Sequence, residues 1–496
     1  MSPTFFALFA GAFSLLCFYL YLKHNYWKRN GIPTVKGCVP LLGHMLPMIR
    51  KRMNFAEFIR LAYEENKDHS MVGIYKGTRP VLIVRDPNLV KTVLQSNFSN
   101  FHENGRKVVP EADPLLAKHP LFSYGEAWST GRKRLTYAFS NVRLKILFTV
   151  VSGVCKKFED FLNRRLKTSN KYEVDLKSLF SRFTGEIVAN AGLSIEGYCF
   201  EDDVRAGSFH EIAENTFEES LGTIIAFHFP SINRLLKLSL LPKSVDGFFR
   251  KVVCENLKVR RNDSTPRNDF LQLMIDMEKT GDVIDEENVS AHAVSLYLDG
   301  TETTSITLNF IGHDLAANPE IQEKLRKEAR STIEKHGGLT FDALKDMTYM
   351  TQVISESQRL HSAVGILQKM CTEEFELQGS DGLTYRIKPG IEVVISVFGL
   401  HGDPKYWLNP NVFDPERFND EKKQTIEKIT YLPFGEGPRI CVGMRMALMQ
   451  IKACLAIILS NYKLELSPRT QVPLMISPHN FLSEPTGGNW VYISKL

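Results

Sequence analysis

The chain has 496 residues, 43% of them hydrophobic, and its 61 basic residues nearly balance its 56 acidic ones. This length supports a large hydrophobic core in one or two domains, and a net charge of +5 gives no reason to propose a nucleic acid as the partner. The eight cysteines include no CxxC pair, which argues against zinc fingers and a disulfide scaffold and indicates a reducing compartment.

The first predicted element is an apolar helix at the amino terminus. Residues 4–22 carry no charge, and a helix of that length, rising ~1.5 Å per residue, nearly crosses a ~30 Å hydrocarbon layer. The stretch then runs into Lys23, Lys28 and Arg29. We interpret residues 1–22 as a retained transmembrane anchor, with a cleaved signal peptide as the alternative. The positive distal flank predicts a lumenal amino terminus and a cytosolic location for the chain that follows.

Residues 23–50 are basic and proline-rich. Pro33, Pro40 and Pro47 remove backbone donors that a helix needs. This composition predicts a stiff linker, followed by one compact domain over residues 51–496.

The rest of the chain is predicted to be mainly α with a small β part. Residues 72–75 and 80–84 alternate like a hairpin around a Lys-Gly-Thr turn. Helical patterns cover 284–336, with a break near Asn318-Pro319, and 347–360. Short strands are predicted near 384–397 and in the last twenty residues. The apolar residues 221–242 are either plain core or a surface that rests on a membrane.

One cysteine, Cys441, lies in an unusual loop. Gly435 and Gly437 permit backbone conformations that a side chain would block. Apolar residues recur at helical spacing after Gly443, so a helix begins just past the cysteine. The amino-terminal dipole and free amides of that helix favour a thiolate, the form that binds a soft metal centre. Arg439 supplies a fork suited to a carboxylate.

The run FGEGPRICVG, from Phe434 to Gly443, resembles the haem-binding signature of the cytochrome P-450 superfamily. Other motifs match in the same order across essentially the whole chain, which is similar in particular to microsomal enzymes of insects and other animals. The resemblance implies a fold in which a long central helix lies over haem b (iron protoporphyrin IX) and a thiolate loop and helix lie beneath it. It also implies that Cys441 is the axial thiolate, that Phe434 packs beside the sulfur, and that Arg439 holds a haem propionate.

Three further residues are implied haem contacts. Trp128 and Arg132 match the family pattern W-x-x-x-R, whose side chains reach the propionates. Lys369 stands where many relatives place a propionate-binding arginine, and a lysine keeps the charge but loses the bidentate geometry.

Glu356 and Arg359 are spaced to share one helix face. A solvated ion pair would give the same pattern. In the family such a pair joins an arginine of a later PERF segment, here Arg417, and the resemblance implies a buried network on the haem side of the core.

The segment LDGTETTS is predicted to carry the catalytic chemistry. Gly300 thins the long helix near the implied haem, and Glu302 with Thr303 places an acid beside a hydroxyl. The resemblance implies that the helix opens here and that the pair delivers protons, with Thr304 as a further hydroxyl. Bending of the helix for structural reasons is the alternative.

Asp299 departs from the family, because most relatives carry alanine at this place. It is either a polar wall of the pocket or, as with a glutamate in one branch of the superfamily, a covalent link to haem.

Substrate contacts are assigned by analogy, and their apolar character predicts a lipophilic compound of the xenobiotic, steroid or fatty-acid type. The candidates are Phe101, Phe122, Leu296, Asp299, Val364, Ile366, Leu367 and Phe481.

The chain carries no Gly-rich dinucleotide fingerprint between a strand and a helix, so electrons must come from a partner. The resemblance implies an NADPH-dependent cytochrome P-450 reductase, with cytochrome b5 as a second partner. Candidates for a basic docking face are Lys133, Arg134, Lys428 and Arg445.

The sequence therefore predicts a monooxygenase of the endoplasmic reticulum membrane that inserts one oxygen atom from O2 into a lipophilic small molecule. One alternative is a haem-thiolate isomerase or dehydratase, against which Glu302 and Thr303 argue. The other is a non-catalytic haem protein that sequesters ligands.

Overall fold

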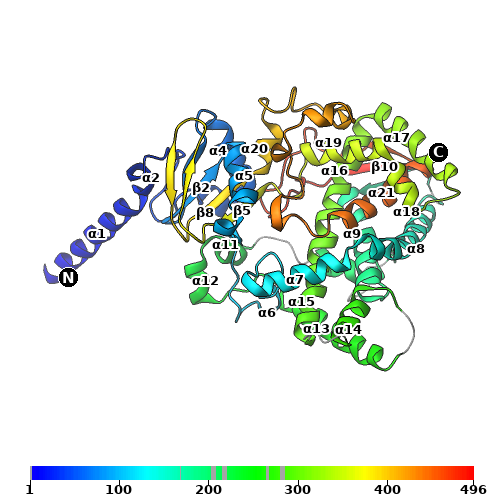
Figure 1. Ribbon diagram of the computed structural model, residues 1–496, viewed down its shortest axis with the longest axis horizontal. Helices are drawn as coiled ribbons and strands as arrows, with labels where there is room; N and C mark the ends of the chain where they lie inside the picture. The colour runs from blue at the N-terminus through cyan, green and yellow to red at the C-terminus, as the bar shows by residue number, and fades with distance from the viewer. Residues whose placement is uncertain (1–2, 168, 203–207, 215–219, 264–266, 280–284) are drawn as a thin grey trace.

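The computed structural model describes residues 3–167, 169–202, 208–214, 220–263, 267–279 and 285–496. Helix α1 (Pro3–His24) extends away from the rest of the chain (Figure 1), and none of its residues is buried. Among the described residues, α1 and α21 (Met444–Asn461) are long and apolar enough to cross a membrane, and α7 (Gly125–Ala138) with α8 (Asn141–Arg165), bent by 63°, would together make a third candidate. Because 56% of α21 is buried inside the protein, it is a core helix, whereas α1 has the properties of an anchor.

The segment predicted to be a linker is instead packed against strand β1 (Met71–Lys76). The Trp27 side chain is fully buried, and its Nε1 donates a hydrogen bond of 2.9 Å to the carbonyl of Ile74. The amide of Val35 donates to the carbonyl of Gly73 at 3.0 Å. The prolines therefore do not make a free connector, because the apolar side chains around them are buried in the domain core.

The predicted hairpin is present. Strand β1 pairs antiparallel with β2 (Arg79–Val84), and β2 continues into a five-stranded sheet of order β1-β2-β8-β5-β3. A three-stranded sheet has the order β4-β10-β9, and β6 pairs with β7. The other strands are β3 (Glu103–Asn104), β4 (Tyr172–Asp175), β5 (Ile366–Met370), β6 (Phe375–Gln378), β7 (Thr384–Ile387), β8 (Glu392–Ser396), β9 (Tyr462–Leu466) and β10 (Trp490–Lys495).

Helices make up most of the described chain, as the sequence predicts. They gather on the side of the molecule away from α1, while the five-stranded sheet lies next to α1 (Figure 1). Besides those already named they are α2 (Tyr26–Arg29), α3 (Leu46–Ile49), α4 (Phe55–Glu65), α5 (Pro87–Lys91), α6 (Pro114–Ala117), α9 (Leu176–Val188), α10 (Phe209–Glu214), α11 (Leu221–His228), α12 (Pro230–Leu236), α13 (Lys243–Arg261), α14 (Phe270–Lys279), α15 (Glu286–Tyr297), α16 (Thr303–Ala317), α17 (Pro319–Lys335), α18 (Phe341–Asp346), α19 (Thr348–Leu360) and α20 (Val397–Gly402).

A long central helix runs through this helical part. It begins with α15, capped by the Asp285 side chain, which accepts a hydrogen bond from the amide of Asn288. It passes through a π-helical turn, η4 (Leu298–Glu302), and continues as α16, which is buried on all sides. A helix that is apolar all round needs such a position in the core. The predicted break at Asn318-Pro319 is confirmed, because α16 ends at Ala317 and α17 begins at Pro319.

The apolar residues 221–242 are part core and part surface. Helix α11 buries Ile224 and Ala226, whereas Leu235 of α12 is 83% exposed. Leu221 and Leu236 are exposed as well. Both helices lie on the side of the molecule that carries the sheet and α1 (Figure 1).

Candidate active site

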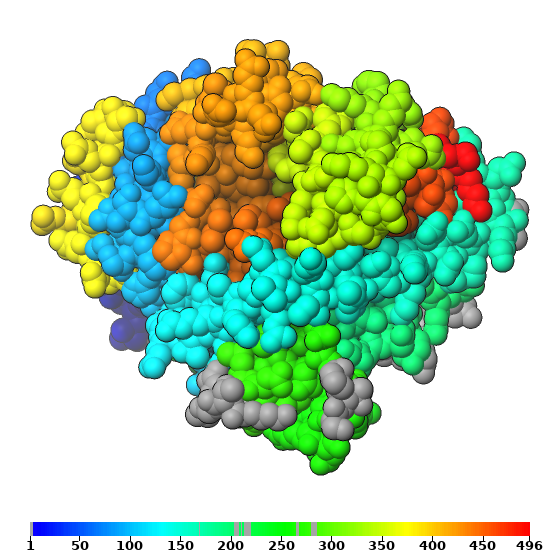
Figure 2. Space-filling view, turned by 45° about the vertical axis from the view of Figure 1, so that its right-hand side comes forward, coloured from blue at the N-terminus to red at the C-terminus, as the bar shows by residue number. Residues whose placement is uncertain are grey.

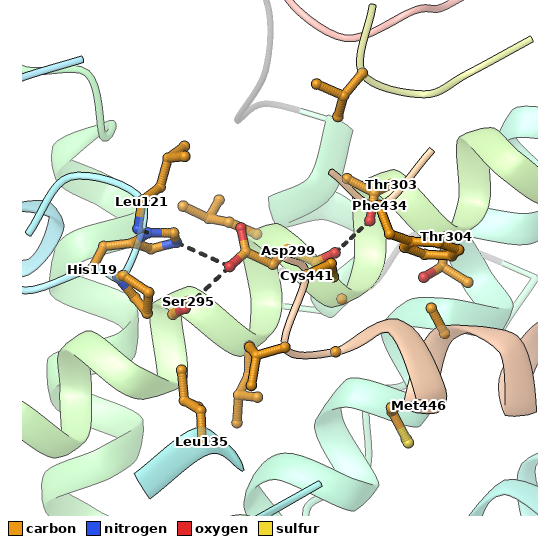
Figure 3. A pocket seen from close by; sticks show the side chains of 18 of the residues that line it. His119, Leu121, Leu135, Ser295, Asp299, Thr303, Thr304, Phe434, Cys441 and Met446 are labelled. Atoms are coloured by element: carbon orange, nitrogen blue, oxygen red, sulfur yellow. Dashed lines mark hydrogen bonds and ion pairs between the residues drawn. The ribbon is translucent and has the colours of Figure 1, made fainter. Parts of the chain in front are cut away.

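A cavity of about 510 Å³ lies inside the helical part, and most of its lining side chains are apolar. Its walls come from α7, from the π-helical turn η4 with the start of α16, and from the loop that precedes α21. Figure 3 shows that Asp299, Thr303, Phe434 and Cys441, which are far apart in the sequence, meet around this space. Such an enclosed apolar space with a few polar groups is typical of a small-molecule site.

The loop before α21 has the backbone that the sequence predicts. Gly435 and Gly437 have φ values of +70° and +76°, a region that side chains rarely adopt. A Cβ atom on Gly437 would also overlap the carbonyl of Leu94. The folded-back loop lets the amide of Cys441 donate a hydrogen bond of 2.9 Å to the carbonyl of Phe434. The helix that follows begins at Met444, as predicted.

The Cys441 sulfur is open to the cavity but lies deep in the protein. This burial, together with the nearby Asp299 carboxylate, raises the pKa of the thiol to about 11. The amides of Gly443 and Met444 act in the opposite direction, as expected at a helix amino terminus. The amides therefore favour the thiolate, as the sequence predicts, but burial outweighs them. A cation in the cavity is needed to hold the sulfur as a thiolate.

Three cationic side chains and an indole ring surround the same cavity. Arg439 donates to the carbonyls of His102, Pro120 and Ser123 at 2.7–3.1 Å, and its guanidinium carbon lies 4.2 Å from the centre of the Trp128 ring. The other two cations are Arg132 and Lys369. Arg132 Nη1 donates a hydrogen bond of 2.6 Å to the carbonyl of Ile440, and Lys369 Nζ donates one of 3.0 Å to Asn104 Oδ1.

Lys369 is buried and the two arginines are half-buried, and the hydrogen bonds of all three go to backbone and amide oxygens rather than to carboxylates. Burial lowers the pKa of Arg439 to about 10. Burial and the neighbouring Arg439 lower the pKa of Lys369 to about 7. Buried charges of one sign need counter-charges. The site therefore fits a ligand that brings carboxylates to the cationic group and a metal ion to the sulfur.

The central helix opens beside the cavity. At the start of α16 the Thr303 hydroxyl donates a hydrogen bond of 2.6 Å to the carbonyl of Asp299, which lies in η4 one turn back. A Cβ atom on Gly300 would lie 3.2 Å from Val188, so glycine lets this turn approach α9 closely. Gly300, Thr303 and Thr304 all line the cavity.

Glu302 is not on the cavity wall, contrary to the prediction that it stands beside Thr303 as an acid. Its carboxylate is buried on the opposite side of the helix, 2.9 Å from the ammonium of Lys177 on α9. Burial works against the charge of Lys177, but Glu302 and Glu484 outweigh it and raise the pKa of this lysine. A buried partner on a neighbouring helix has thus turned the acid away from the cavity. No pattern in the sequence predicts that Lys177 pairs with Glu302.

Asp299 does line the cavity. Its Oδ2 lies 3.3 Å from Nε2 of His119 and accepts a hydrogen bond of 3.2 Å from Ser295. His119 comes from the loop between α6 and α7, and Ser295 from α15 one turn earlier. The sequence analysis predicted neither contact. Ser295 could have been found from its spacing, because residues four apart on a helix lie on the same face.

Seven of the eight substrate candidates line the cavity, and one does not. Phe101 is fully buried in the core beside the sheet, where its ring centre lies 6.0 Å from that of Phe375. Its assignment by analogy was wrong, because the loop turns this ring toward β6. Those that line the cavity are Phe122, Leu296, Asp299, Val364, Ile366, Leu367 and Phe481.

Glu356, Arg359 and Arg417 meet below the cavity, as their spacing and order suggest. Glu356 Oε1 lies 2.8 Å from Arg359 Nη2 and 3.2 Å from Arg417 Nε. Both Glu356 and Arg359 are fully buried. The amide of Asp414 adds a hydrogen bond of 3.0 Å to the same carboxylate oxygen. The pair is therefore not a solvated surface contact.

The face on the cysteine side of the molecule carries exposed basic residues. Lys133, Lys428 and Arg445 are exposed, whereas Arg134 is buried and drops out of the predicted docking face, because it points into the protein from α7. Figure 2 shows that the segments around 400–450 (orange) and α7 with α8 (cyan) meet on one face.

Comparisons with known proteins agree with this site. The sequence profile of the family "Cytochrome P450" matches residues 33–491. The chain is 33% identical over 504 residues to "Probable cytochrome P450 28d1" of Drosophila melanogaster, covering 99% of both chains. It is 31% identical over 526 residues to "Cytochrome P450 9e2" of Blattella germanica, covering 98% of this chain and 97% of the relative. It is also 31% identical over 504 residues to "Cytochrome P450 6a2" of Drosophila melanogaster, covering 98% of both.

Proposed function

Since the chain belongs to the cytochrome P450 family and is therefore a haem b monooxygenase, we propose that it inserts one oxygen atom of O2 into a lipophilic small molecule, with electrons from NADPH through a cytochrome P450 reductase. The compounds proposed are of the xenobiotic, steroid or fatty-acid type. Cytochrome b5 is proposed as a second electron donor.

The residues present fit haem. Cys441 would ligate the iron, and Phe434 would lie beside the sulfur. The cations Arg132, Lys369 and Arg439 would take up the propionate charges, with Trp128 against Arg439. When bound, haem supplies the oxygen-activating chemistry, which a thiolate ligand favours by donating electron density to the iron.

The chain's own residues would handle protons and water at the opened helix. Thr303 presents its hydroxyl on the cavity wall and is the group proposed to pass protons on at Oγ1. Glu302 is proposed to supply protons from behind the turn, which requires its carboxylate to move away from Lys177. The apolar wall formed by Phe122, Leu296 and their neighbours would exclude bulk water and hold the lipophilic part of the substrate.

A location on the endoplasmic reticulum membrane is proposed from two features on one side of the molecule. None of the residues of helix α1 is buried, and Lys23 in its last turn and Lys28 beyond it favour a lumenal amino terminus. The exposed leucines of α11 and α12, among them Leu235 and Leu236, would rest on the same membrane. The basic face with Lys133, Lys428 and Arg445 would then remain free for an acidic reductase surface.

The observation that carries this proposal is a cysteine whose sulfur opens into a largely apolar cavity that is also lined by three cations, of which Lys369 is buried and Arg132 and Arg439 are half-buried. The test is mass analysis of products after incubation of the purified protein with reductase, NADPH and a panel of steroids, fatty acids and plant-type toxins. A reductase-dependent gain of one oxygen atom in one compound class is expected. If compounds bind and shift the haem spectrum but emerge without added oxygen, the proposal is wrong and the isomerase or sequestering alternatives replace it.

A further inference from the structure

Asp299 places a carboxylate on the wall of a cavity whose lining side chains are mostly apolar. The side chain is 59% exposed, although it lines an interior space. Figure 3 shows the side chains of His119 and Ser295 pointing toward it, with Thr303 one turn further along the helix. The contacts of the carboxylate with His119 and Ser295 are both made by the same oxygen, Oδ2.

The hydrogen bonds of His119 define which nitrogen faces Asp299. Nδ1 of His119 accepts a hydrogen bond of 3.0 Å from the amide of Leu121, and accepting requires a lone pair on that nitrogen. The hydrogen of the neutral ring is therefore on Nε2, 3.3 Å from Asp299 Oδ2. His119 is 2% exposed, so the ring is fixed in place. A neutral imidazole orients the carboxylate but does not cancel its negative charge.

Among the described residues, two other carboxylates line the cavity. Asp269 lies 2.6 Å from Nη1 of Arg260, and both side chains are buried. Glu436 accepts a hydrogen bond of 3.0 Å from the amide of Gly437. Oδ1 of Asp299 and Oε2 of Glu436 make no hydrogen bond or ion pair within the described part of the chain, and of these two carboxylates Asp299 lies on the central helix whereas Glu436 lies in the cysteine loop.

We propose that Asp299, oriented by His119 and Ser295, binds the protonated amine of a lipophilic substrate, so that the preferred substrates of this enzyme are amphiphilic amines. A carboxylate in a space of low polarity attracts a cation far more strongly than it would in water. The apolar wall binds the rest of the molecule, and the same carboxylate repels fatty-acid anions. The inference rests on the proposed function, since it specifies the substrate class of that site.

Three probes of one shape separate charge from size. They are N,N-dimethyl-4-phenylbutylamine, its carbon isostere (5-methylhexyl)benzene, and the anion 5-phenylpentanoate. Binding to the haem-loaded enzyme is measured by calorimetry and in parallel by haem absorbance, which distinguishes an amine that ligates iron. The enzyme is expected to bind the amine at least about ten-fold more tightly than the isostere and to bind the anion most weakly. Equal affinity for amine and isostere, or an amine that binds only through iron, would overturn the inference.

The variant Asp299→Asn keeps the size and the contacts to His119 and Ser295 but removes the charge. It is expected to bind amine and isostere with equal affinity. Glu287→Gln, which removes an exposed carboxylate from α15 outside the cavity lining, is the matched control and is expected to keep the full preference. An Asp299→Asn enzyme that still prefers the amine overturns the inference. If that variant yields no haem-loaded protein, Asp299→Leu replaces it and is expected to prefer the isostere.

Product formation from (5-methylhexyl)benzene separates this inference from the proposed function. If the enzyme oxidises the isostere but shows no preference for the amine, the result supports the proposed function and contradicts amine binding by Asp299. If the enzyme binds the amine through Asp299 but oxidises none of the three probes, the result supports amine binding by Asp299 and argues against the proposed function.

Discussion

Asp299 and Glu302 lie three residues apart on one turn of helix, yet their carboxylates have opposite surroundings. Asp299 faces the cavity, while Glu302 is buried against Lys177 on α9. Glu302 Oε2 makes no hydrogen bond within the described part of the chain, so this carboxylate depends on one cationic partner. Which acid faces the cavity is decided by the helix packed behind it, and a single sequence contains no record of that packing.

We expect Lys177→Met to lower the free energy of unfolding by roughly 3–5 kcal/mol, because it leaves the buried Glu302 carboxylate unpaired. The double variant Lys177→Met with Glu302→Gln should recover much of this loss. The matched control is Lys171→Met, which removes an exposed pair with Glu465 at 2.7 Å and should cost less than about 1 kcal/mol. Urea unfolding followed by haem absorbance measures all three. Similar losses for Lys177→Met and Lys171→Met would contradict this account of Glu302.

A second residue-scale prediction concerns pH and His401. This ring is buried between the core and the cysteine loop, where its Nε2 accepts a hydrogen bond of 2.8 Å from the amide of Leu432. Burial, and then the neighbouring Arg359, lower the pKa of His401 from 6.5 to about 3. Between these two pH values the unfolded chain binds a proton that the folded chain does not. Stability is therefore full above pH 6.5 and falls as the pH drops.

From this one group we expect the free energy of unfolding to fall by roughly 2 kcal/mol between about pH 6.5 and pH 5. In His401→Gln this part of the pH dependence should disappear, whereas His479→Gln, at an exposed site, should leave it unchanged. Urea midpoints at a series of pH values provide the measurement. An unaltered pH dependence in His401→Gln would show that other groups cause the loss.

At the scale of elements, the sequence predicted best where a short motif fixes its own backbone. The glycines around Cys441 have the positive φ values that their residue type indicates, and the next helix begins where the apolar spacing begins. It predicted less well which way a loop or helix turns a side chain. Phe101 packs on the sheet and Arg134 points inward, because tertiary contacts rather than local pattern select the buried face.

The network of Glu356 with Arg359 and Arg417 gives a prediction at this scale. Glu356→Ala leaves two arginines beside a removed carboxylate in the core, a loss of roughly 3–5 kcal/mol, and should abolish haem incorporation. The chain contains a matched control in a second E-x-x-R sequence on α4, where Glu57 lies 2.5 Å from Arg60 at the surface. Glu57→Ala should give a normal haem yield, measured as haem absorbance per protein. A normal yield from Glu356→Ala would refute the structural role of the network.

For the whole molecule, the boundary between anchor and domain is the part that the sequence placed least well. Prolines and charges in residues 23–50 suggested a connector, but this segment contributes Trp27, Ile32 and Met45 to the core. The segment lacks the alternation of apolar and polar residues that predicts a half-buried strand. It is attached to the domain by individual side chains such as Trp27 and by isolated backbone hydrogen bonds. The central helix, the hairpin of β1 and β2 and the cysteine loop were anticipated from the sequence, whereas strands β3 and β5 of the same sheet were not.

Two truncations test this boundary. Removal of residues 2–23 should leave a haem-loaded protein that sediments less with membranes, with partial retention through α11 and α12. Removal of residues 2–50 should give no haem-loaded protein. Each large buried side chain lost contributes roughly 1.5–3 kcal/mol, and several together equal the whole stability of roughly 5–15 kcal/mol. Sedimentation and haem absorbance are the measurements, and a normal haem content in the longer truncation would contradict the packing of this segment.

The central claim is that the sulfur of Cys441 binds haem iron as a thiolate inside the cationic cavity. The most direct measurement is the absorption spectrum of the reduced, carbon monoxide-bound protein, compared among the unmodified chain, Cys441→Ser and the control Cys254→Ser, a half-buried cysteine remote from the cavity lining. We predict the red-shifted Soret band of an anionic sulfur ligand for the unmodified chain and for Cys254→Ser, and its complete loss in Cys441→Ser. A red-shifted band that survives in Cys441→Ser, or that is missing from the unmodified haem-loaded protein, would contradict the claim.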